Sequence, residues 1–251
     1  MTASRGVLVT GGSRGIGRVI ARSFAERGDR VAVHYGSSRE RAEEVLAELP
    51  GSGHVVVGGD MGDADAVGAM VDEAATALGR LDVLVNNAGV FVASPPLKSS
   101  YDHWREVWGR TLAVNLVGAA NATFRAVPHL VAAGGGAVVN VSSRAAFRGE
   151  PDNPAYAASK AGLNAFAQSM ALALAPHGIS VTCVAPGFVQ TEREREVLDG
   201  PGGDAVRAQS PFGRVARPEE VASAVVWLAS PEARFSSGTI VDVNGASYLR
   251  S

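Results

Sequence analysis

The stretch VLVTGGSRGIGRVIARSF, residues 7–24, decides the fold class of this chain. It begins with a short apolar run rich in β-branched residues and continues into a longer pattern typical of a helix. Three glycines lie between the two, at Gly11, Gly15 and Gly17, in the spacing T-G-x-x-x-G-x-G. The stretch therefore predicts a strand, a glycine-rich turn and a helix at the start of the domain.

The same alternation continues along the chain. Helical patterns such as residues 39–49 and 64–79 lie between further apolar runs, at 30–35, 54–59, 81–87, 136–143, 179–186 and 238–243. The runs are almost entirely apolar, as expected when helices cover both faces of a sheet. Strand–helix alternation with right-handed crossovers predicts an α/β Rossmann fold, with a seven-stranded, doubly wound parallel sheet and helices on both faces.

We find no interior linker, low-complexity tract or repeat, so residues 1–251 are predicted to form one domain. The exception to the regular rhythm is Gln190–Arg214, QTEREREVLDGPGGDAVRAQSPFGR. It is charged, rich in Gly and Pro, and long for a connection. Such segments are often lids or binding loops, and we expect this one to contact substrate.

The glycine turn predicts dinucleotide binding. Glycines let backbone N–H groups approach a pyrophosphate, and the N-terminus of a helix favours its negative charge. A purely structural turn explains the glycines alone about as well. Their position after the first strand of an alternating chain favours the dinucleotide.

The end of the second predicted strand indicates which dinucleotide. An acidic residue there binds a ribose 2′-hydroxyl, but this chain reads VAVHYGSSRE, with Tyr35, Ser37, Ser38 and Arg39. Arg14 lies within the glycine turn. A cation and hydroxyls suit a 2′-phosphate, so NADP(H) is predicted over NAD(H). The alternative is that both arginines are solvated surface charges.

A tyrosine and a lysine stand four residues apart in AYAASKAG, residues 155–162. On a helix, Tyr156 and Lys160 lie on one face, side by side. The spacing alone is common, and a packed tyrosine with a solvated lysine explains it equally. Other motifs are needed to decide.

Composition excludes several classes of protein. Apolar residues make up 46% of the chain, which argues against disorder, and the net charge of −2 offers no basic surface for nucleic acid. Cys183, the single cysteine, lies in a predicted strand and is expected to be a packed thiol. No apolar run reaches the ~18 residues of a membrane span, and the first residues contain no long apolar segment. We therefore expect no membrane association and a cytoplasmic location.

The histidines are scattered and form no ligand cluster with Cys183, so no metal site is predicted. Each is expected to be a surface or packing histidine: His34, His54, His103, His129 and His177.

The whole chain resembles the short-chain dehydrogenase/reductase family. The motifs that carry the resemblance occur in the family's order and spacing: TGGSRGIG (10–17), Asp60, NNAG (86–89), Asn115 in LAVNLVG, Ser143 in NVSSR, Tyr156 with Lys160, and PGFVQT (186–191).

The resemblance implies catalytic roles. Tyr156 would be the general acid/base at the substrate oxygen, and Ser143, rather than Ser142, would hydrogen-bond that oxygen, since it lies thirteen residues before Tyr156. Lys160 would bind the nicotinamide ribose and lower the pKa of Tyr156. Asn115 would anchor a water that links Lys160 to solvent.

The resemblance also implies cofactor contacts. Asp60 and Met61 would meet the adenine, and Asn87, Ala88 and Gly89 would line the adenosine side. Pro186, Gly187, Val189 and Thr191 would hold the nicotinamide end. The remaining contacts, besides Tyr156, Lys160 and the residues named for the 2′-phosphate, are Gly11, Ser13, Gly15, Ile16 and Gly17.

Within the family the chain looks most like 3-oxoacyl-[acyl-carrier-protein] reductases and similar carbonyl reductases. Such reductases often carry basic residues before the fifth strand, but HLVAAGGGAVVNV has no Lys or Arg there. We therefore expect a ketone or aldehyde reductase, with an acyl-carrier substrate kept as an alternative. Arg144 and Arg148 either contact a polar or anionic substrate or lie on the surface.

The resemblance implies a homotetramer or a homodimer, with the helices around Asn115 and Tyr156 at the interface. Two other functions remain open. One is an NAD-dependent dehydrogenase of a sugar, polyol or steroid, and the other is a non-catalytic dinucleotide sensor. A sensor would be expected to lose the catalytic Tyr or Lys, which this chain keeps.

Overall fold

Alternate residues of the first strand face opposite sides of the sheet. In the computed structural model, which describes residues 4–250, Val7 and Val9 pack into one apolar core and Leu8 into another. All three side chains are fully buried, as expected of a strand covered on both faces.

The seven strands form one parallel sheet in the order β3-β2-β1-β4-β5-β6-β7, which confirms the predicted fold class. Their bounds lie within two residues of the predicted runs: β1 (Gly6–Val9), β2 (Arg30–Tyr35), β3 (Val55–Gly58), β4 (Val83–Asn86), β5 (Gly136–Val141), β6 (Ile179–Pro186) and β7 (Ile240–Val243). The order reverses between β1 and β4. Ligands of open α/β sheets bind at such a switch point, outside the carboxyl ends of the strands.

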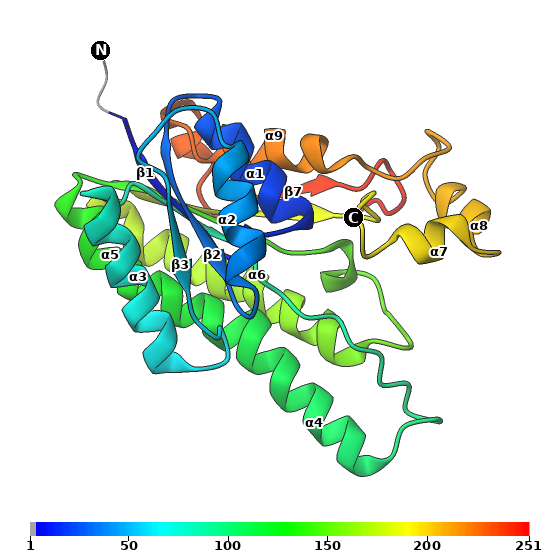
Figure 1. Cartoon of the computed structure of the whole chain (residues 1–251). Coiled ribbons are helices and arrows are strands. Elements are labelled where there is room, and N and C mark those ends of the chain that lie inside the picture. Colours follow the sequence, from blue (N-terminus) through cyan, green and yellow to red (C-terminus); the bar gives the residue numbers. More distant parts are fainter. Residues whose placement is uncertain (1–3, 251) are drawn as a thin grey trace.

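Two layers of helices enclose the sheet (Figure 1). One core lies under α1 (Gly15–Ala25), α2 (Arg39–Glu48) and α9 (Pro218–Leu228). The other lies under α3 (Ala64–Leu78), α5 (Ala119–Ala132) and α6 (Pro154–Leu174). This is the doubly wound arrangement that the alternating pattern predicts.

Two elements extend from the carboxyl side of the sheet. Helix α4 (Tyr101–Leu112) continues into α5 through the π-helical segment η1 (Ala113–Gly118). The segment Gln190–Arg214 contains two short helices, α7 (Arg195–Asp199) and α8 (Gly203–Arg207), which project from the body of the molecule (Figure 1). The remaining short helices are 3₁₀ turns: η2 (Arg144–Ala146), η3 (Ala175–His177) and η4 (Pro231–Ser236).

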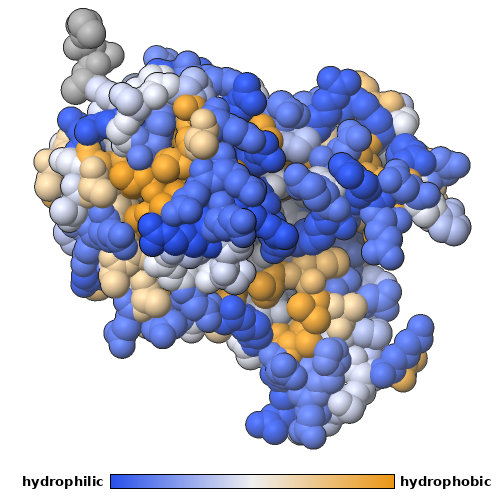
Figure 2. All heavy atoms as spheres, viewed as in Figure 1, coloured by the Kyte–Doolittle hydropathy of each residue, from blue (hydrophilic) through white to orange (hydrophobic). Residues whose placement is uncertain are grey.

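A hollow separates the projecting lobe of α7 and α8 from the lobe that ends in α4, and hydrophobic residues are exposed along it (Figure 2). Among the described residues, no helix is both long and apolar enough to cross a membrane.

Candidate active site

The glycine turn brings backbone unusually close to backbone. Gly11 and Gly15 have φ of 64° and 52°, a region that suits glycine. A Cβ on Gly17 would overlap the carbonyl oxygen of Gly11 and lie 2.5 Å from Nδ2 of Asn87. Arg14, the N-cap of α1, makes no side-chain capping bond. The first N–H groups of α1 therefore remain available to an anion.

The NNAG loop supports this turn from the next strand. Thr10 Oγ1 accepts hydrogen bonds from the backbone N–H groups of Asn87 (2.9 Å) and Ala88 (3.1 Å). Asn87 Nδ2 donates to the carbonyl oxygens of Thr10 (2.9 Å) and Gly11 (3.2 Å). The amide of Asn87 thus holds the glycine turn, a role that the sequence did not indicate for it or for Thr10.

Of the residues predicted for the 2′-phosphate, Tyr35 ends β2 and is half-buried, whereas Ser37 and Arg39 are exposed beyond β2. The side chain of Arg14 is exposed and forms no hydrogen bond or ion pair with the described part of the chain. Arg39 pairs with Glu43 across one turn of α2 at 2.8 Å. Ser38 is the N-cap of α2 and accepts from the backbone N–H of Arg41 at 3.4 Å. Arg14 is therefore available to a ligand, while Arg39 and Ser38 already have partners.

The residues predicted at the adenine differ in exposure. Asp60 is exposed and accepts two hydrogen bonds from Arg110 of α4, at 2.9 and 2.8 Å. The Arg110 guanidinium and the backbone N–H of Gly62 lower the pKa of Asp60. Met61 is buried in the core under α3 and α5. The side chain of Asp60 can thus meet a ligand only as a carboxylate already paired with Arg110.

Tyr156 and Lys160 lie near the start of α6, as their spacing predicts. The helix begins with Pro154 at its first position, where the missing N–H costs nothing. Lys160 Nζ lies 5.7 Å from the centre of the Tyr156 ring and donates to the carbonyl oxygen of Val141 at 2.8 Å. Lys160 is buried and Tyr156 half-buried. The packed tyrosine with a solvated lysine is therefore wrong for this pair.

Burial shifts both pKa values away from the charged forms. It lowers the pKa of Lys160 to about 8, so the ammonium is still mostly protonated at neutral pH. It raises the pKa of Tyr156, against smaller opposing effects of the Ser143 hydroxyl and the Arg193 guanidinium. Without a bound ligand the phenol is therefore protonated at neutral pH.

The two adjacent serines have different surroundings. Ser142 is buried, and its hydroxyl donates to the carbonyl oxygen of Lys160 at 3.4 Å. Ser143 is half-buried, and its hydroxyl accepts a hydrogen bond from the backbone N–H of Ala145 at 3.0 Å, which caps η2. The same hydroxyl lies close enough to the Tyr156 phenol to lower the pKa of that phenol. The structure thus brings Ser143 to Tyr156, as its spacing predicts.

Asn115 lies in η1, where the helix widens between α4 and α5. Its Nδ2 donates to Val90 O at 3.0 Å and to Ser159 Oγ at 3.1 Å, and its Oδ1 accepts from Val90 N at 2.8 Å. A Cβ placed on Gly89 would lie 3.4 Å from Asn115 Oδ1 and 3.7 Å from Lys160 Nζ. Asn115 therefore joins the NNAG loop to α6, and its water-anchoring role remains a prediction. Single π-helical turns often occur at functional sites.

The segment after β6 returns to the glycine turn. A Cβ on Gly15 would lie 3.7 Å from Thr191 Cγ2 and 3.9 Å from a carboxylate oxygen of Glu192. Gly187 pairs with the end of β7, and Val189 is buried. The segment Pro186–Thr191 thus runs from the end of β6 to the start of α1, where Thr191 lies beside Gly15.

Residues at the start of Gln190–Arg214 cover the tyrosine. The Arg193 guanidinium lies 5.4 Å from the centre of the Phe91 ring, which packs edge-on against Tyr156 at 4.8 Å between ring centres. Arg193 also donates to Glu194 at 3.1 Å. The segment therefore contacts the mouth of the site, as expected for a substrate loop.

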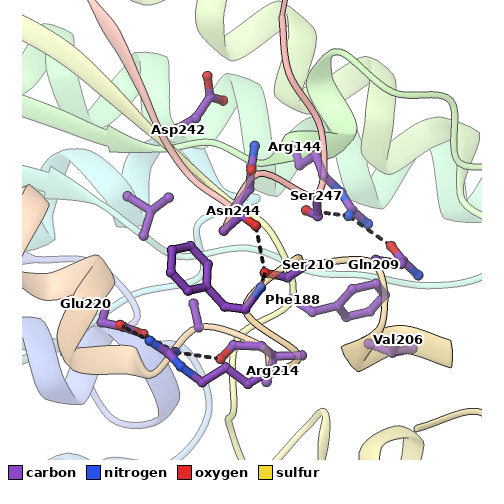
Figure 3. Close-up of a pocket in the computed structure, with 15 residues that line it drawn as sticks. Arg144, Phe188, Val206, Gln209, Ser210, Arg214, Glu220, Asp242, Asn244 and Ser247 are labelled. Atoms are coloured by element: carbon purple, nitrogen blue, oxygen red, sulfur yellow. Dashed lines mark hydrogen bonds and ion pairs between the residues drawn. The ribbon is translucent and has the colours of Figure 1, made fainter. Parts of the chain in front are cut away.

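A cavity of about 330 Å³, with Phe188 in its wall, lies between the end of the substrate segment and the turn after β7 (Figure 3). Arg144 forms part of its wall, is only 4% exposed, and donates to Gln209 at 2.9 Å and Ser247 at 2.8 Å. The surface alternative is therefore wrong for Arg144, while Arg148 is exposed and donates to the same Gln209 oxygen. Sequence gave no signal for this burial.

The comparisons with known proteins agree with this geometry. A family model described as enoyl-(acyl carrier protein) reductase matches residues 11–246. The 3-oxoacyl-[acyl-carrier-protein] reductase of Staphylococcus aureus is 36% identical, over 99% of this chain and 100% of its own length. The chain belongs to the short-chain dehydrogenase/reductase family.

Two further relatives extend the range of substrates and ligands in the family. A cis-4-hydroxycyclohexanecarboxylate dehydrogenase of Sinomonas cyclohexanicum is 40% identical, over 97% of this chain and 96% of its own length. A short-chain dehydrogenase from Burkholderia cenocepacia, solved in complex with NADP, superposes with a TM-score of 0.88 at 36% identity, covering 97% of both chains. This chain is thus an oxidoreductase of a family that includes acyl-carrier and cyclic-alcohol enzymes.

Sequence reasoning also missed the role of His34 in this short-chain dehydrogenase. His34 is buried at the end of β2 and hydrogen-bonds both the glycine turn and the residue before Asp60. It is therefore more than a packing histidine. Within residues 4–250, no group of three metal-ligating side chains comes together.

Proposed function

We propose that this chain is an NADP(H)-dependent oxidoreductase that acts on a ketone or secondary alcohol. The observation that carries the proposal is the group of Ser143, Tyr156 and Lys160 beside a glycine turn at the switch point of the sheet. A phenol, a hydroxyl and an ammonium in one cleft suit proton transfer at a carbonyl oxygen.

The glycine turn fits a dinucleotide. A Cβ at Gly17 would fill the close approach of α1 to the turn, and α1 carries no side-chain cap. Backbone N–H groups there would hold the pyrophosphate. Arg14 would meet a 2′-phosphate, with Arg39 joining it in exchange for Glu43. The nicotinamide, when bound, supplies or accepts the hydride.

The chain's own residues would move the proton. Tyr156 is protonated in the unliganded site and so is ready to donate to a carbonyl oxygen. Ser143 would hold that oxygen beside the phenol. Lys160, mostly charged below its pKa of about 8, would favour the phenolate as it forms. For oxidation of an alcohol the same groups act in reverse.

The substrate class is the finer part of the proposal. We favour a ketone or a 3-oxoacyl thioester, the latter supported by the name of the S. aureus relative. A hydroxy or oxo acid is the second candidate, because Arg193 places a cation near Tyr156 and the Sinomonas relative is named for a cyclic hydroxy acid. Glu194, which accepts from Arg193, offsets part of that charge.

The proposed assembly is a homotetramer or homodimer of a cytoplasmic protein. Large apolar side chains stand exposed on the surface, with Phe124 of α5 at 73%, Leu172 of α6 at 83% and Phe235 of η4 at 105%. Contiguous exposed apolar patches are typical of interfaces. Light scattering of the purified chain tests this.

The test of the function is NADPH and NADH oxidation over a panel of 3-oxoacyl thioesters, neutral cyclic ketones and 4-oxocyclohexanecarboxylate. Tyr156→Phe is expected to abolish turnover while NADPH still binds. Faster reduction of the oxo acid than of its methyl ester would favour the second candidate. Turnover retained by Tyr156→Phe would refute the mechanism.

A further inference from the structure

His34 connects two loops at the carboxyl edge of the sheet. Its Nδ1 accepts a hydrogen bond from the backbone N–H of Gly11 at 2.9 Å, and its Nε2 lies 2.8 Å from the carbonyl oxygen of Gly59. Because Nδ1 accepts, the ring proton must lie on Nε2, which can then donate to Gly59. The two contacts together fix one neutral tautomer.

Both loops belong to the proposed dinucleotide site. Gly11 begins the glycine turn, with its φ of 64°, and Gly59 directly precedes Asp60 at the adenine side. Two backbone bonds accompany the ring, from Gly12 N to His34 O at 2.9 Å and from Gly59 N to Tyr35 O at 3.1 Å. The ring adds two more bonds, one to each loop.

We propose that neutral His34 is a positioning residue that holds the glycine turn in its cofactor-binding geometry, and that protonation of the ring weakens dinucleotide binding. The proposal rests on the proposed function, since the ligand is the same dinucleotide. It adds a residue whose role is to determine where the turn lies.

Protonation would reverse the contact with the glycine turn. A second proton on the ring makes Nδ1 a donor that faces the N–H donor of Gly11. The charge would also be enclosed, because His34 is only 1% exposed. The donor–donor contact pushes Gly11 away from the ring, and the buried charge further destabilises the arrangement in which the turn is held, so the turn must move.

Burial and the charges around the ring together determine that His34 becomes protonated only on the acid side of neutrality. Burial lowers the pKa of His34 from its ordinary value of 6.5, and Asp60 at the end of β3 opposes this. Asp60 is itself paired with Arg110 of α4. On the side of the glycine turn, the contact is a backbone N–H, which does not titrate. We therefore expect binding to be unaffected at pH 7.5 and to weaken below pH 6.

The experiment measures the Kd of NADP+ by calorimetry from pH 5 to 8, for the full-length chain and three variants. His34→Asn keeps one acceptor and one donor but does not titrate in this range. His34→Leu keeps an apolar side chain and loses both bonds. His177→Asn is the matched control, since His177 is exposed at the end of η3.

The expected results separate positioning from packing. His34→Leu should weaken binding about five-fold or more at pH 7.5, because it leaves the partly buried N–H of Gly11 without an acceptor. His34→Asn should bind within about two-fold of wild type at pH 7.5 and show a shallower loss at low pH. Since the 2′-phosphate itself titrates near pH 6, the ratio of wild-type to variant Kd at each pH is the quantity compared. His177→Asn should follow wild type throughout.

Two results would overturn the inference. One is a Kd ratio between wild type and His34→Asn that does not change from pH 8 to pH 5. The other is a folded His34→Leu that binds as tightly as wild type. If wild type itself binds no NADP+ at pH 8, the proposed function fails too. If it binds and turns over but the ratio is flat, only the role of His34 is wrong.

Discussion

Replacing Gly17 by alanine tests the geometry of the glycine turn directly. The added Cβ would overlap the carbonyl oxygen of Gly11 and lie 2.5 Å from Nδ2 of Asn87, about 1 Å inside a normal contact. Neither neighbour is free to withdraw, because Asn87 Nδ2 donates to Thr10 and Gly11, and Gly11 is bonded to His34. The turn must therefore shift or the contacts must remain strained.

Overpacking of this kind costs about 1–3 kcal/mol. If the free protein keeps the strain, the melting temperature falls, by about 2–4 °C per kcal/mol for a chain of this size. If the turn relaxes instead, the cost appears in binding, as a Kd for NADPH weaker by about 5- to 150-fold. The loss of thermal stability and the loss of NADPH affinity, each expressed as a free energy, should together amount to about 1–3 kcal/mol.

The matched control is Gly109→Ala, the same substitution inside a helix. Gly109 lies on the exposed face of α4, and nothing lies within 4 Å of a Cβ built there. Alanine should stabilise that helix by about 0.5–1 kcal/mol and leave NADPH binding unchanged. The assay is thermal unfolding together with a fluorescence titration of NADPH. If Gly17→Ala matches Gly109→Ala in both measurements, the close approach described here does not exist.

Three further changes probe the rest of the site. Glu192→Gln should tighten NADPH binding about 3- to 10-fold in a fluorescence titration, since a carboxylate beside Gly15 repels a pyrophosphate, while Glu196→Gln serves as a control. Arg14→Gln should weaken NADPH but not NADH, and equal losses would contradict the 2′-phosphate contact. Lys160→Met should be more stable than wild type below pH 8, because it removes a buried charge. The pKa of Lys160 is about 8 in the folded protein and about 10.4 in the unfolded chain, so wild type gains stability between pH 8 and 10 and the variant does not. The difference in Tm between the two proteins should therefore shrink over that range.

The sheet was predictable because each strand is a local pattern. Runs such as 179–186 are mostly apolar and are buried throughout, and their position between helical patterns predicts a parallel, covered sheet. The Tyr156–Lys160 pair was predictable for the same reason, since helical spacing places both on one face. What one sequence segment determines by itself is readable from that segment.

Partners far apart in the chain were not predictable. The burial of Arg144 depends on Gln209 and Ser247, more than sixty residues away. Asn115, within the π-helical segment, bonds Val90 and Ser159, which lie 25 and 44 residues away, and LAVNLVG carries no local signal for these contacts. His34 lies among strand residues, and only the approach of Gly11 and Gly59 gives its ring a role.

Several residues predicted to meet the cofactor already have polar partners within the protein. Ser38 accepts from α2, Asn87 holds the glycine turn, and Asp60 is paired with Arg110. These roles differ in how easily a ligand can share them. A hydroxyl keeps a donor and a second lone pair after accepting one bond, so Ser38 can cap α2 and still meet a phosphate. Asn87 uses both N–H donors of its amide on two carbonyl oxygens, so its contribution to a ligand is limited to its backbone and its carbonyl oxygen.

Among these contacts within the protein, the ion pair of Arg39 with Glu43 is the weakest. Both side chains are more than half exposed, and ion pairs of this kind contribute little to stability. A 2′-phosphate carries more charge than one carboxylate and offers more acceptors to a guanidinium. Arg39 can therefore exchange Glu43 for the 2′-phosphate of NADPH at little cost. NADH lacks that phosphate, so Arg39 would stay paired with Glu43 when NADH binds. The preference for NADPH should accordingly depend on Arg14 first, because Arg14 has no partner to give up among the residues of the described chain.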